Sequence, residues 1–226
     1  MTVIMGLSKY YSGLRAIKAK AKAEQTMKTV NFTSMQDGTR EEYEFLDRLE
    51  DEYKAGLPDR ILESLRKLEH SLSGYRISRL EHSLQGATRA FRAGESEQMI
   101  VAILLHDIGD ELATYSHSEM AAAILRPFVS EEIYWIVKHH GVFQMYYYAH
   151  HCGGDRNCRE IYRDHPCYQD AIDFCHNYDQ NCFDPDYDSE PLEFFEPIVR
   201  RVMSQPGFDD AEQLARYGET TSSKTS

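Results

Sequence analysis

The sequence lacks the features that mark several protein classes. No apolar run approaches the roughly 20 residues that a helix needs to span a bilayer, so we expect no integral membrane protein. The five cysteines contain no Cys-x-x-Cys pair, and their odd number argues against a zinc ribbon or a complete disulfide framework. We therefore expect free thiols in a reducing, cytoplasmic compartment.

Positive charge is also scarce. Lysine and arginine number 25 against 37 acidic residues, which gives a net charge of −12. An acidic chain repels nucleic acid unless its basic residues cluster, so we expect no nucleic-acid partner. The hydrophobic fraction of 42% and the charged fraction of 27% are ordinary for a globular protein. A length of 226 residues suits one domain with an appendage.

The two ends of the chain differ from its middle. No acid precedes Glu24, whereas lysines recur in this first segment. We expect residues 1–26 to be a basic extension, either disordered or a targeting segment, with a mitochondrial location if it is a presequence. Because Met27 offers a second start, the extension could also be an artefact of gene prediction. We expect residues 218–226 to form a disordered tail, which leaves residues 27–217 as the folded domain.

The middle of the chain carries helical signals and no convincing pair of strands. Thr39 with Glu42 matches a capping box that opens a helix ended by Gly56. Ser116 with Glu119 matches a second capping box. Further helices are expected at about 58–70, 78–92, 97–108, 118–125, 130–140, 167–178 and 191–203. We therefore expect an all-α single domain.

Ten histidines are present, and several adjoin apolar helix faces. The clearest case is His106-Asp107, at the end of the almost wholly apolar segment 97–108. Burying both side chains is unfavourable unless partners satisfy them. Metal coordination would do so, and a hydrogen-bonded pair that ends the helix is the alternative. Ligand-type side chains near apolar faces occur on four further predicted helices: His82, His117, His139 or His140, and Asp179.

This ordered set resembles the HD superfamily of metal-dependent phosphohydrolases and related oxygenases. The string His106-Asp107-Ile108-Gly109 is the superfamily's HDIG motif in full, and the resemblance covers roughly residues 75–179. It implies an HD-domain helical bundle around a binuclear metal centre. The ligands implied for the first metal are His82, His106, Asp107 and Asp179. The ligands implied for the second are His117 and His140, with Asp107 bridging the two ions.

The string LEHSLQ at residues 80–85 is similar to the diiron oxygenase branch, which includes myo-inositol oxygenase and phosphonate-cleaving enzymes. This resemblance implies a mixed-valent Fe(II)/Fe(III) pair, O2 and a small polar substrate. The implied reaction cleaves a C–C or C–P bond next to a hydroxyl-bearing carbon.

The alternative is an HD-type phosphohydrolase that acts on a nucleotide or small phosphoester with Mn, Co or Mg. Arginines such as Arg156, Arg159 or Arg163 could then bind the phosphate. A non-enzymatic, metal-dependent binding module is a third hypothesis. The sequence sets no oligomeric state.

Departures from the phosphonate-cleaving branch bear on the substrate. The candidates for substrate binding or catalysis are Tyr75, Gln85, Asp110, Gln144 and His176. Those at 110, 144 and 176 stand where such relatives carry a basic side chain, so a phosphonate dianion would lose charge-assisted hydrogen bonds. Their tyrosine that covers the open iron aligns with Leu72, and Tyr75 could replace it. These departures disfavour a phosphonate more than they disfavour an oxygenase.

A run of tyrosines at 146–148 with Trp135 nearby has the composition of a quaternary-ammonium cage. Three consecutive helical residues point in different directions, so at most part of the run can share one pocket. Ordinary aromatic packing is therefore the favoured interpretation.

Overall fold

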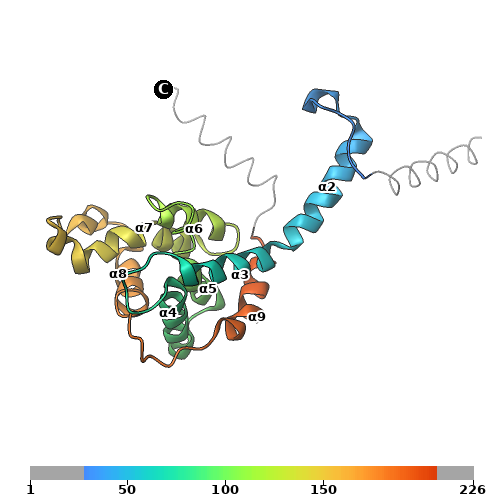
Figure 1. Ribbon diagram of the computed structural model, residues 1–226. Coiled ribbons are helices and arrows are strands. Elements are labelled where there is room, and N and C mark those ends of the chain that lie inside the picture. Colours follow the sequence, from blue (N-terminus) through green and yellow to red (C-terminus); the bar gives the residue numbers. More distant parts are fainter. Residues whose placement is uncertain (1–27, 208–226) are drawn as a thin grey trace, which may run out of the picture. The chain divides into compact units, whose positions relative to one another are not determined.

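The computed structural model describes residues 28–207, and this range is helical without a β-strand (Figure 1). The all-α class expected from the sequence is therefore confirmed. The segments 1–26 and 218–226 lie outside the described residues. The chain divides into two compact units between Gly56 and Leu57, inside the segment that the sequence analysis treats as one domain. No helix within residues 28–207 is long and apolar enough to cross a membrane.

The described part of the first unit, residues 28–56, contains the short 3-10 helix η1 (Met35–Asp37) and helix α2 (Arg40–Ala55). The Thr39 hydroxyl accepts a hydrogen bond from the Glu42 amide, and the Glu42 carboxylate accepts one from the Thr39 amide at 2.9 Å. The predicted capping box is thus confirmed. Glu42 also accepts from the Asn31 amide at 2.6 Å, which holds the preceding segment against the first turn.

The second unit begins with three helices whose ends follow local signals. Helix α3 (Leu57–Lys67) has Pro58 in its first turn and ends in the 3-10 turn η2 (Leu68–His70). Helix α4 (Arg79–Ala93) is opened by a capping box of Ser78 and Glu81. It ends at Gly94, whose φ of 79° is a left-handed conformation that glycine adopts without strain. Helix α5 (Glu97–Leu105) begins after Ser96, whose hydroxyl accepts from the Met99 amide.

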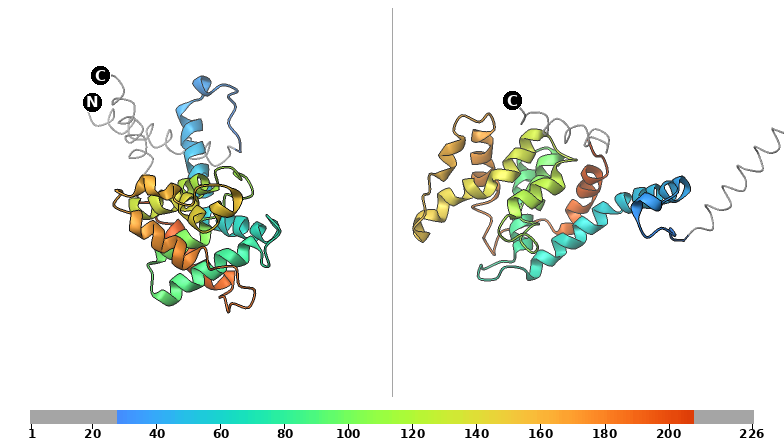
Figure 2. Two further views of the ribbon diagram at one scale, coloured as in Figure 1. Left: turned by 90° about the vertical axis from the view of Figure 1, so that its left-hand side faces the viewer. Right: turned by 90° about the horizontal axis from the view of Figure 1, so that it is seen from above.

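The rest of the second unit contains four helices and two 3-10 turns within the described range. They are α6 (His117–Leu125), α7 (Glu131–Tyr148), η3 (Ala149–Cys152), η4 (Cys158–Tyr162), α8 (Tyr168–Tyr178) and α9 (Leu192–Met203). In Figure 2 the yellow and orange segment that follows α7 folds back beside that helix, in agreement with the contacts of η3, η4 and α8 with α7.

Three local expectations differ from the structure. The capping box predicted at Ser116 was wrong, because its side chain makes no capping hydrogen bond. Its amide is tied instead to the Ala113 carbonyl at 2.7 Å, in a turn that leaves Ser116 with φ −150° and ψ 36° rather than the extended backbone of a cap. Helix α7 does not end at His140 but continues to Tyr148. Helix α5 ends at Leu105, so His106 and Asp107 follow it directly.

Helix α5 lies at the centre of the second unit. Its residues Val101 to Leu105 have no exposed surface, and helices α4, α7 and α9 pack against it. The mostly apolar sequence of this helix predicted such a position. Because α5 is held on several sides, the two residues that follow it, His106 and Asp107, start from a rigid point in the core.

Candidate metal centre

Six side chains of the second unit meet at one place. They come from α4, the end of α5, the start of α6, the middle of α7 and the end of α8. Five of the six residues are at most 4% exposed, while the His117 side chain retains 29% of its surface. The six are His82, His106, Asp107, His117, His140 and Asp179. These are the six ligands that the HD resemblance implies, so residues up to 97 positions apart in sequence, from 82 to 179, share one site.

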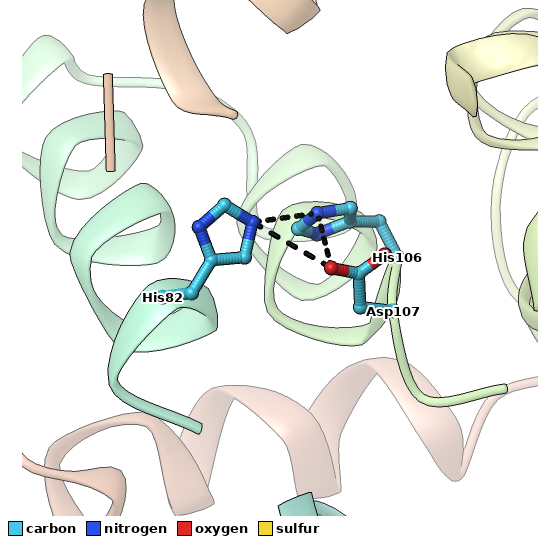
Figure 3. Close-up of side chains that lie close together, drawn as sticks. All are labelled: His82, His106 and Asp107. Carbon is cyan, nitrogen blue, oxygen red and sulfur yellow. Dashed lines mark hydrogen bonds and ion pairs between the residues drawn. The ribbon is translucent and has the colours of Figure 1, made fainter. Parts of the chain in front are cut away.

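The first group of possible ligands consists of His82, His106 and Asp107 (Figure 3). The two Nε2 atoms lie 3.2 Å apart. Asp107 Oδ2 lies 3.6 Å from His82 Nε2 and 3.4 Å from His106 Nε2. Figure 3 shows both rings and the carboxylate turned toward one point between them.

Asp179 adds a fourth donor atom, a carboxylate oxygen, to this group. Its Oδ1 lies 3.3 Å from His82 Nε2 and 3.9 Å from His106 Nε2. Asp179 follows the last residue of α8 with φ −127° and ψ −69°, outside the helical conformation, so its carboxylate leaves the helix end toward the histidines.

A second group lies on the other side of Asp107. Its Oδ1 is 3.5 Å from His117 Nε2 and 3.6 Å from His140 Nε2. One carboxylate oxygen thus faces the first group and the other faces the second. This is the arrangement expected of a carboxylate that bridges two metal ions.

The distances among these atoms fit metal coordination. Two ligands bound at right angles to one ion, each at about 2.1 Å, lie about 3 Å apart. The separations within each group, 3.2–3.9 Å, are close to that value. Mixed imidazole and carboxylate donors suit iron or manganese better than a closed structural zinc site. The residues present therefore fit a pair of divalent or trivalent ions.

The opposite nitrogen of three rings is fixed by the backbone. Nδ1 of His82 pairs with the Cys182 carbonyl at 2.9 Å. Nδ1 of His106 and of His140 pair with carbonyls three residues earlier, at 2.6 and 2.7 Å. A carbonyl oxygen can only accept, so each Nδ1 carries the proton and each Nε2 presents its lone pair to the site.

The fourth ring, His117, is supported by a carboxylate. Asp110 Oδ1 lies 3.6 Å from His117 Nδ1, while its Oδ2 lies 3.0 Å from Arg79 Nε. A carboxylate behind a ligand histidine orients the ring and raises its basicity. Asp110 therefore contacts a possible ligand rather than the pocket described below.

Two glycines allow the ligand-bearing segments to approach closely. A Cβ on Gly109 would lie 2.7 Å from the His117 carbonyl oxygen and 2.8 Å from its Cα. A Cβ on Gly86 would lie 2.4 Å from the carbonyl oxygen of Tyr178, the residue before Asp179. Neither separation is possible for a real side chain, so the HDIG glycine is required by the backbone that carries His117.

Burial and charge prepare the groups for a cation. Burial lowers the pKa of His106 to about 4, despite the carboxylates nearby. Burial alone would raise the pKa of Asp107, but the rings of His106, His140 and His82 outweigh it and hold that pKa well below its usual range. At neutral pH Asp107 is therefore charged and His106 neutral, the protonation states that metal binding requires.

A pocket of about 290 Å³ opens on this centre. Four of the six possible ligands reach it: Asp107, His117, His140 and Asp179. Its other walls are Tyr75, Arg79, Gly141, Gln144, Tyr147, Tyr148, Gln180 and Phe183. The pocket thus joins a polar floor to a largely aromatic rim, which is typical of a site for a small molecule.

Two of the five predicted substrate-binding residues line this pocket. Tyr75 stacks on Phe183 with ring centroids 4.9 Å apart. Gln144 Nε2 donates to Asp179 Oδ1 at 2.9 Å, and its buried Oε1 makes no hydrogen bond with the described residues. A substrate donor could therefore pair with Gln144.

The other three candidates lie outside the pocket lining. Gln85 is occupied by the backbone of Asp184, donating to its carbonyl at 2.6 Å and accepting from its amide at 3.2 Å. His176 is exposed and contacts the Tyr147 hydroxyl at 3.4 Å. Asp110 supports His117, as described above. Gln85 and Asp110 therefore support other residues of the site. His176 does not line the pocket but contacts Tyr147, which does.

The structure also distinguishes the roles of adjacent residues that the sequence left open. His140 joins the ligand group, whereas His139 Nδ1 pairs with the Trp135 carbonyl at 2.8 Å and its ring packs on Trp135. Of the three consecutive tyrosines, Tyr147 and Tyr148 line the pocket. Trp135 stacks on His165 instead and takes no part in the lining.

Four pocket residues were not expected from the sequence: Arg79, Gly141, Gln180 and Phe183. Arg79 precedes His82 by three positions, so helical periodicity places both on one face of α4, and this signal could have identified it. Phe183 stacks on the His82 ring at 4.4 Å. It follows Asp179 in an irregular loop, where no periodicity indicates its direction.

Comparison with known proteins finds two similarities. Residues 79–168 match the family model of the HD domain. A 1-hydroxy-2-(trimethylamino)ethylphosphonate dioxygenase that forms glycine betaine, from Leisingera caerulea, is 33% identical over 92 residues. That match covers 36% of this chain and 47% of the relative, so the chain is matched to about half of the relative's length.

Proposed function

We propose that this protein, whose residues 79–168 form an HD domain, is a binuclear non-haem iron oxygenase. Its reaction would cleave a C–C or C–P bond next to a hydroxyl-bearing carbon of a small polar substrate. The observation that carries the proposal is the pair of ligand groups that share Asp107 and open on one pocket. The similarity to a phosphonate dioxygenase supports the oxygenase branch.

The donor set divides between two ions. His82, His106 and Asp179 would hold the first, His117 and His140 the second, and Asp107 both. Bound by these residues, a mixed-valent iron pair would supply O2 activation at one ion and orientation of the substrate hydroxyl at the other. The first group is more deeply buried, because neither His82 nor His106 lines the pocket.

The chain's own residues position the substrate beside these ligands. Gln144 is fixed by its bond to Asp179 and leaves Oε1 free to accept from a substrate hydroxyl or amine. Tyr75 and Phe183 stack on each other, and Phe183 covers the His82 ring, so the aromatic pair limits water on that side. We propose that this pair does the work of the tyrosine cover in the phosphonate-cleaving enzymes.

The phosphohydrolase alternative uses the same ligands but needs cations for a phosphate. The arginines considered for that purpose face elsewhere. Arg156 and Arg159 lie over the ring of Tyr146, 4.2 and 3.7 Å from its centroid, and Arg163 pairs with Glu160 at 2.6 Å. None of the three lines the pocket in the described part of the chain, so these arginines give the hydrolase no support.

Metal analysis of protein purified without oxygen tests this proposal. We expect about two iron ions per chain and, after partial oxidation, an electron paramagnetic resonance signal of a coupled Fe(II)/Fe(III) pair. His117→Gln should abolish the coupled signal, whereas the matched surface variant His151→Gln should keep it. A redox-inert metal at full occupancy, together with turnover of phosphoesters on addition of Mn, would instead establish the hydrolase.

A further inference from the structure

We propose that Arg79 binds an anionic group of the substrate and makes the pocket selective for small oxyanions. This inference deepens the proposed function and rests on the same metal centre. The chemistry in question is shared by carboxylates and phosphorus oxyanions. Three positions that are basic in the phosphonate-cleaving enzymes are Asp110, Gln144 and His176 here, and Arg79 supplies a cation from another place.

Arg79 is the sole lysine or arginine among the residues that line the pocket in the described chain. It is the first residue of α4, and its side chain is 15% exposed. Its position one helical turn before His82 directs it to the face of α4 that bears the ligand. A permanent cation is thus held next to the metal centre and within reach of a bound molecule.

The guanidinium is held by charge and stacking. Arg79 Nη1 lies 3.4 Å from Asp107 Oδ2, and Nε lies 3.0 Å from Asp110 Oδ2. Neither Arg79 Nε nor Asp110 Oδ2 makes a hydrogen bond with the described residues, although both atoms are buried. The Tyr75 ring supports the guanidinium, 5.0 Å from its carbon. An arginine has five N–H donors, so donors remain for a ligand.

Metal binding would increase the attraction of Arg79 for an anion. Both oxygens of Asp107 face histidine nitrogens of the two ligand groups. When these oxygens bind metal ions, Asp107 no longer balances Arg79, and Asp110 remains as its one close carboxylate. A mostly buried guanidinium with a reduced counter-charge favours a substrate oxyanion, which it can bind through two parallel hydrogen bonds.

The surrounding walls limit what accompanies the anion. Tyr75, Phe183, Tyr147 and Tyr148 form an aromatic rim in a volume of about 290 Å³. Gln144 offers an acceptor beside Asp179. These groups suit a short molecule with its oxyanion at Arg79 and a hydroxyl or amine near Gln144.

Binding of simple anions to zinc-loaded protein tests this role without oxygen or turnover. The probes are inorganic phosphate, methylphosphonate and acetate, measured by titration calorimetry. The variants are Arg79→Gln and Arg79→Lys, with Arg200→Gln as a matched control on the surface of α9. Arg200 pairs with Asp59 and does not line the pocket.

We expect Arg79→Gln to bind the probes at least about tenfold more weakly than wild type, with the same zinc content. Arg79→Lys should recover part of the affinity, and Arg200→Gln should match wild type. If Arg79→Gln loses affinity for all three probes, Arg79 forms a general oxyanion site. If it loses affinity for phosphate and methylphosphonate alone, the site is specific for phosphorus oxyanions.

Unchanged probe affinity in Arg79→Gln at equal zinc occupancy would overturn the inference. If that variant fails to hold zinc, the neutral variant Arg79→Met takes its place, and unchanged probe affinity with a full zinc complement would overturn the inference. A redox-inert native metal would defeat the oxygenase proposal yet leave this binding result unaffected, so the two failures are distinguishable.

Discussion

Asp110 Oδ1 lies 3.6 Å from His117 Nδ1, on the side of the ring opposite to the nitrogen that faces Asp107. Within residues 28–207, this is the one carboxylate behind a ring of the four proposed ligand histidines, since the other three rings rest on backbone carbonyls. Of the two histidines at the second metal position, His117 therefore depends on a charged side chain, whereas both histidines of the first position depend on the main chain.

Asp110→Asn should weaken the second metal position and spare the first. The amide keeps the size of the side chain but removes the negative charge that raises the basicity of His117. We expect about a tenfold loss of affinity for the second ion. A metal titration followed by calorimetry would measure both steps. Asp173→Asn on the exposed face of α8 is the control, and equal weakening of both steps would contradict this assignment.

Gly109→Ala should remove His117 from the site through the backbone. The added methyl group would lie 2.7 Å from the His117 carbonyl oxygen, so the start of α6 must move. We expect a destabilisation of about 1–3 kcal/mol and loss of one of two bound ions. Denaturant unfolding and metal stoichiometry measure these effects. Gly154→Ala, whose Cβ would meet its nearest neighbour at an ordinary 3.4 Å, should leave both unchanged.

Much of the fold was predictable because its signals are local. Thr39 and Ser78 cap their helices through the side chain-to-backbone bonds that their spacing indicates, and Gly94 ends α4 in a left-handed conformation. The signal at Ser116 failed because a neighbouring turn determines its backbone. The continuation of α7 past Gly141 was hidden because packing of residues such as Phe143, fully buried, outweighs the weak helix propensity of glycine.

The six possible ligands were predictable because their order along the chain matches the HD pattern. The contacts of the residues around these ligands were not predictable. The pairing of Gln85 with Asp184 and of Asp110 with Arg79 joins side chains through the tertiary fold, and neither spacing nor composition indicates it. The choice between His139 and His140 likewise depends on the rotation of α7 about its axis, which its nearly uniform apolarity leaves undetermined.

The histidines of the metal-free protein should titrate differently. We expect the His106 ring to have a pKa of about 4 because of burial. Burial also lowers the pKa of His82, but the carboxylates of Asp179 and Asp107 outweigh it and raise that pKa above its usual value. Nuclear magnetic resonance of the ring carbons measures both. Added metal should abolish both titrations, and a His106 midpoint above that of His82 would contradict this order.

The shift at His106 has a definite sign for stability. Its folded pKa is below the usual 6.5, so the unfolded chain binds more protons between pH 4 and 6.5. The contribution of this pKa shift to the free energy of unfolding is fully present above pH 6.5 and is lost as the pH falls toward 4. Its total is about 3 kcal/mol. In metal-free protein, His106→Gln should therefore show a shallower fall in unfolding free energy over that range. If the unfolding free energies of wild type and His106→Gln change in parallel with pH, His106 makes no such contribution.

Phe183→Ala should uncover the first metal position. Phe183 stacks on the His82 ring at 4.4 Å and on Tyr75 at 4.9 Å, and it follows Cys182, whose carbonyl holds His82 Nδ1. Removal of the ring frees His82 to move and admits water. We expect transfer of the bound metal to a chelator to become about tenfold faster, with a stability loss of about 1–3 kcal/mol.

Two control variants distinguish the shielding of the first metal position by Phe183 from an overall loss of stability. Tyr75→Phe keeps a ring on Phe183 and should keep slow metal release. Phe91→Ala removes an aromatic contact with Phe194 on the far part of α4, where the ring is 43% exposed. If Phe91→Ala accelerates release as much as Phe183→Ala, the effect comes from lower stability. If only Phe183→Ala does so, the stacked aromatic pair is the barrier between the first ligand group and solvent.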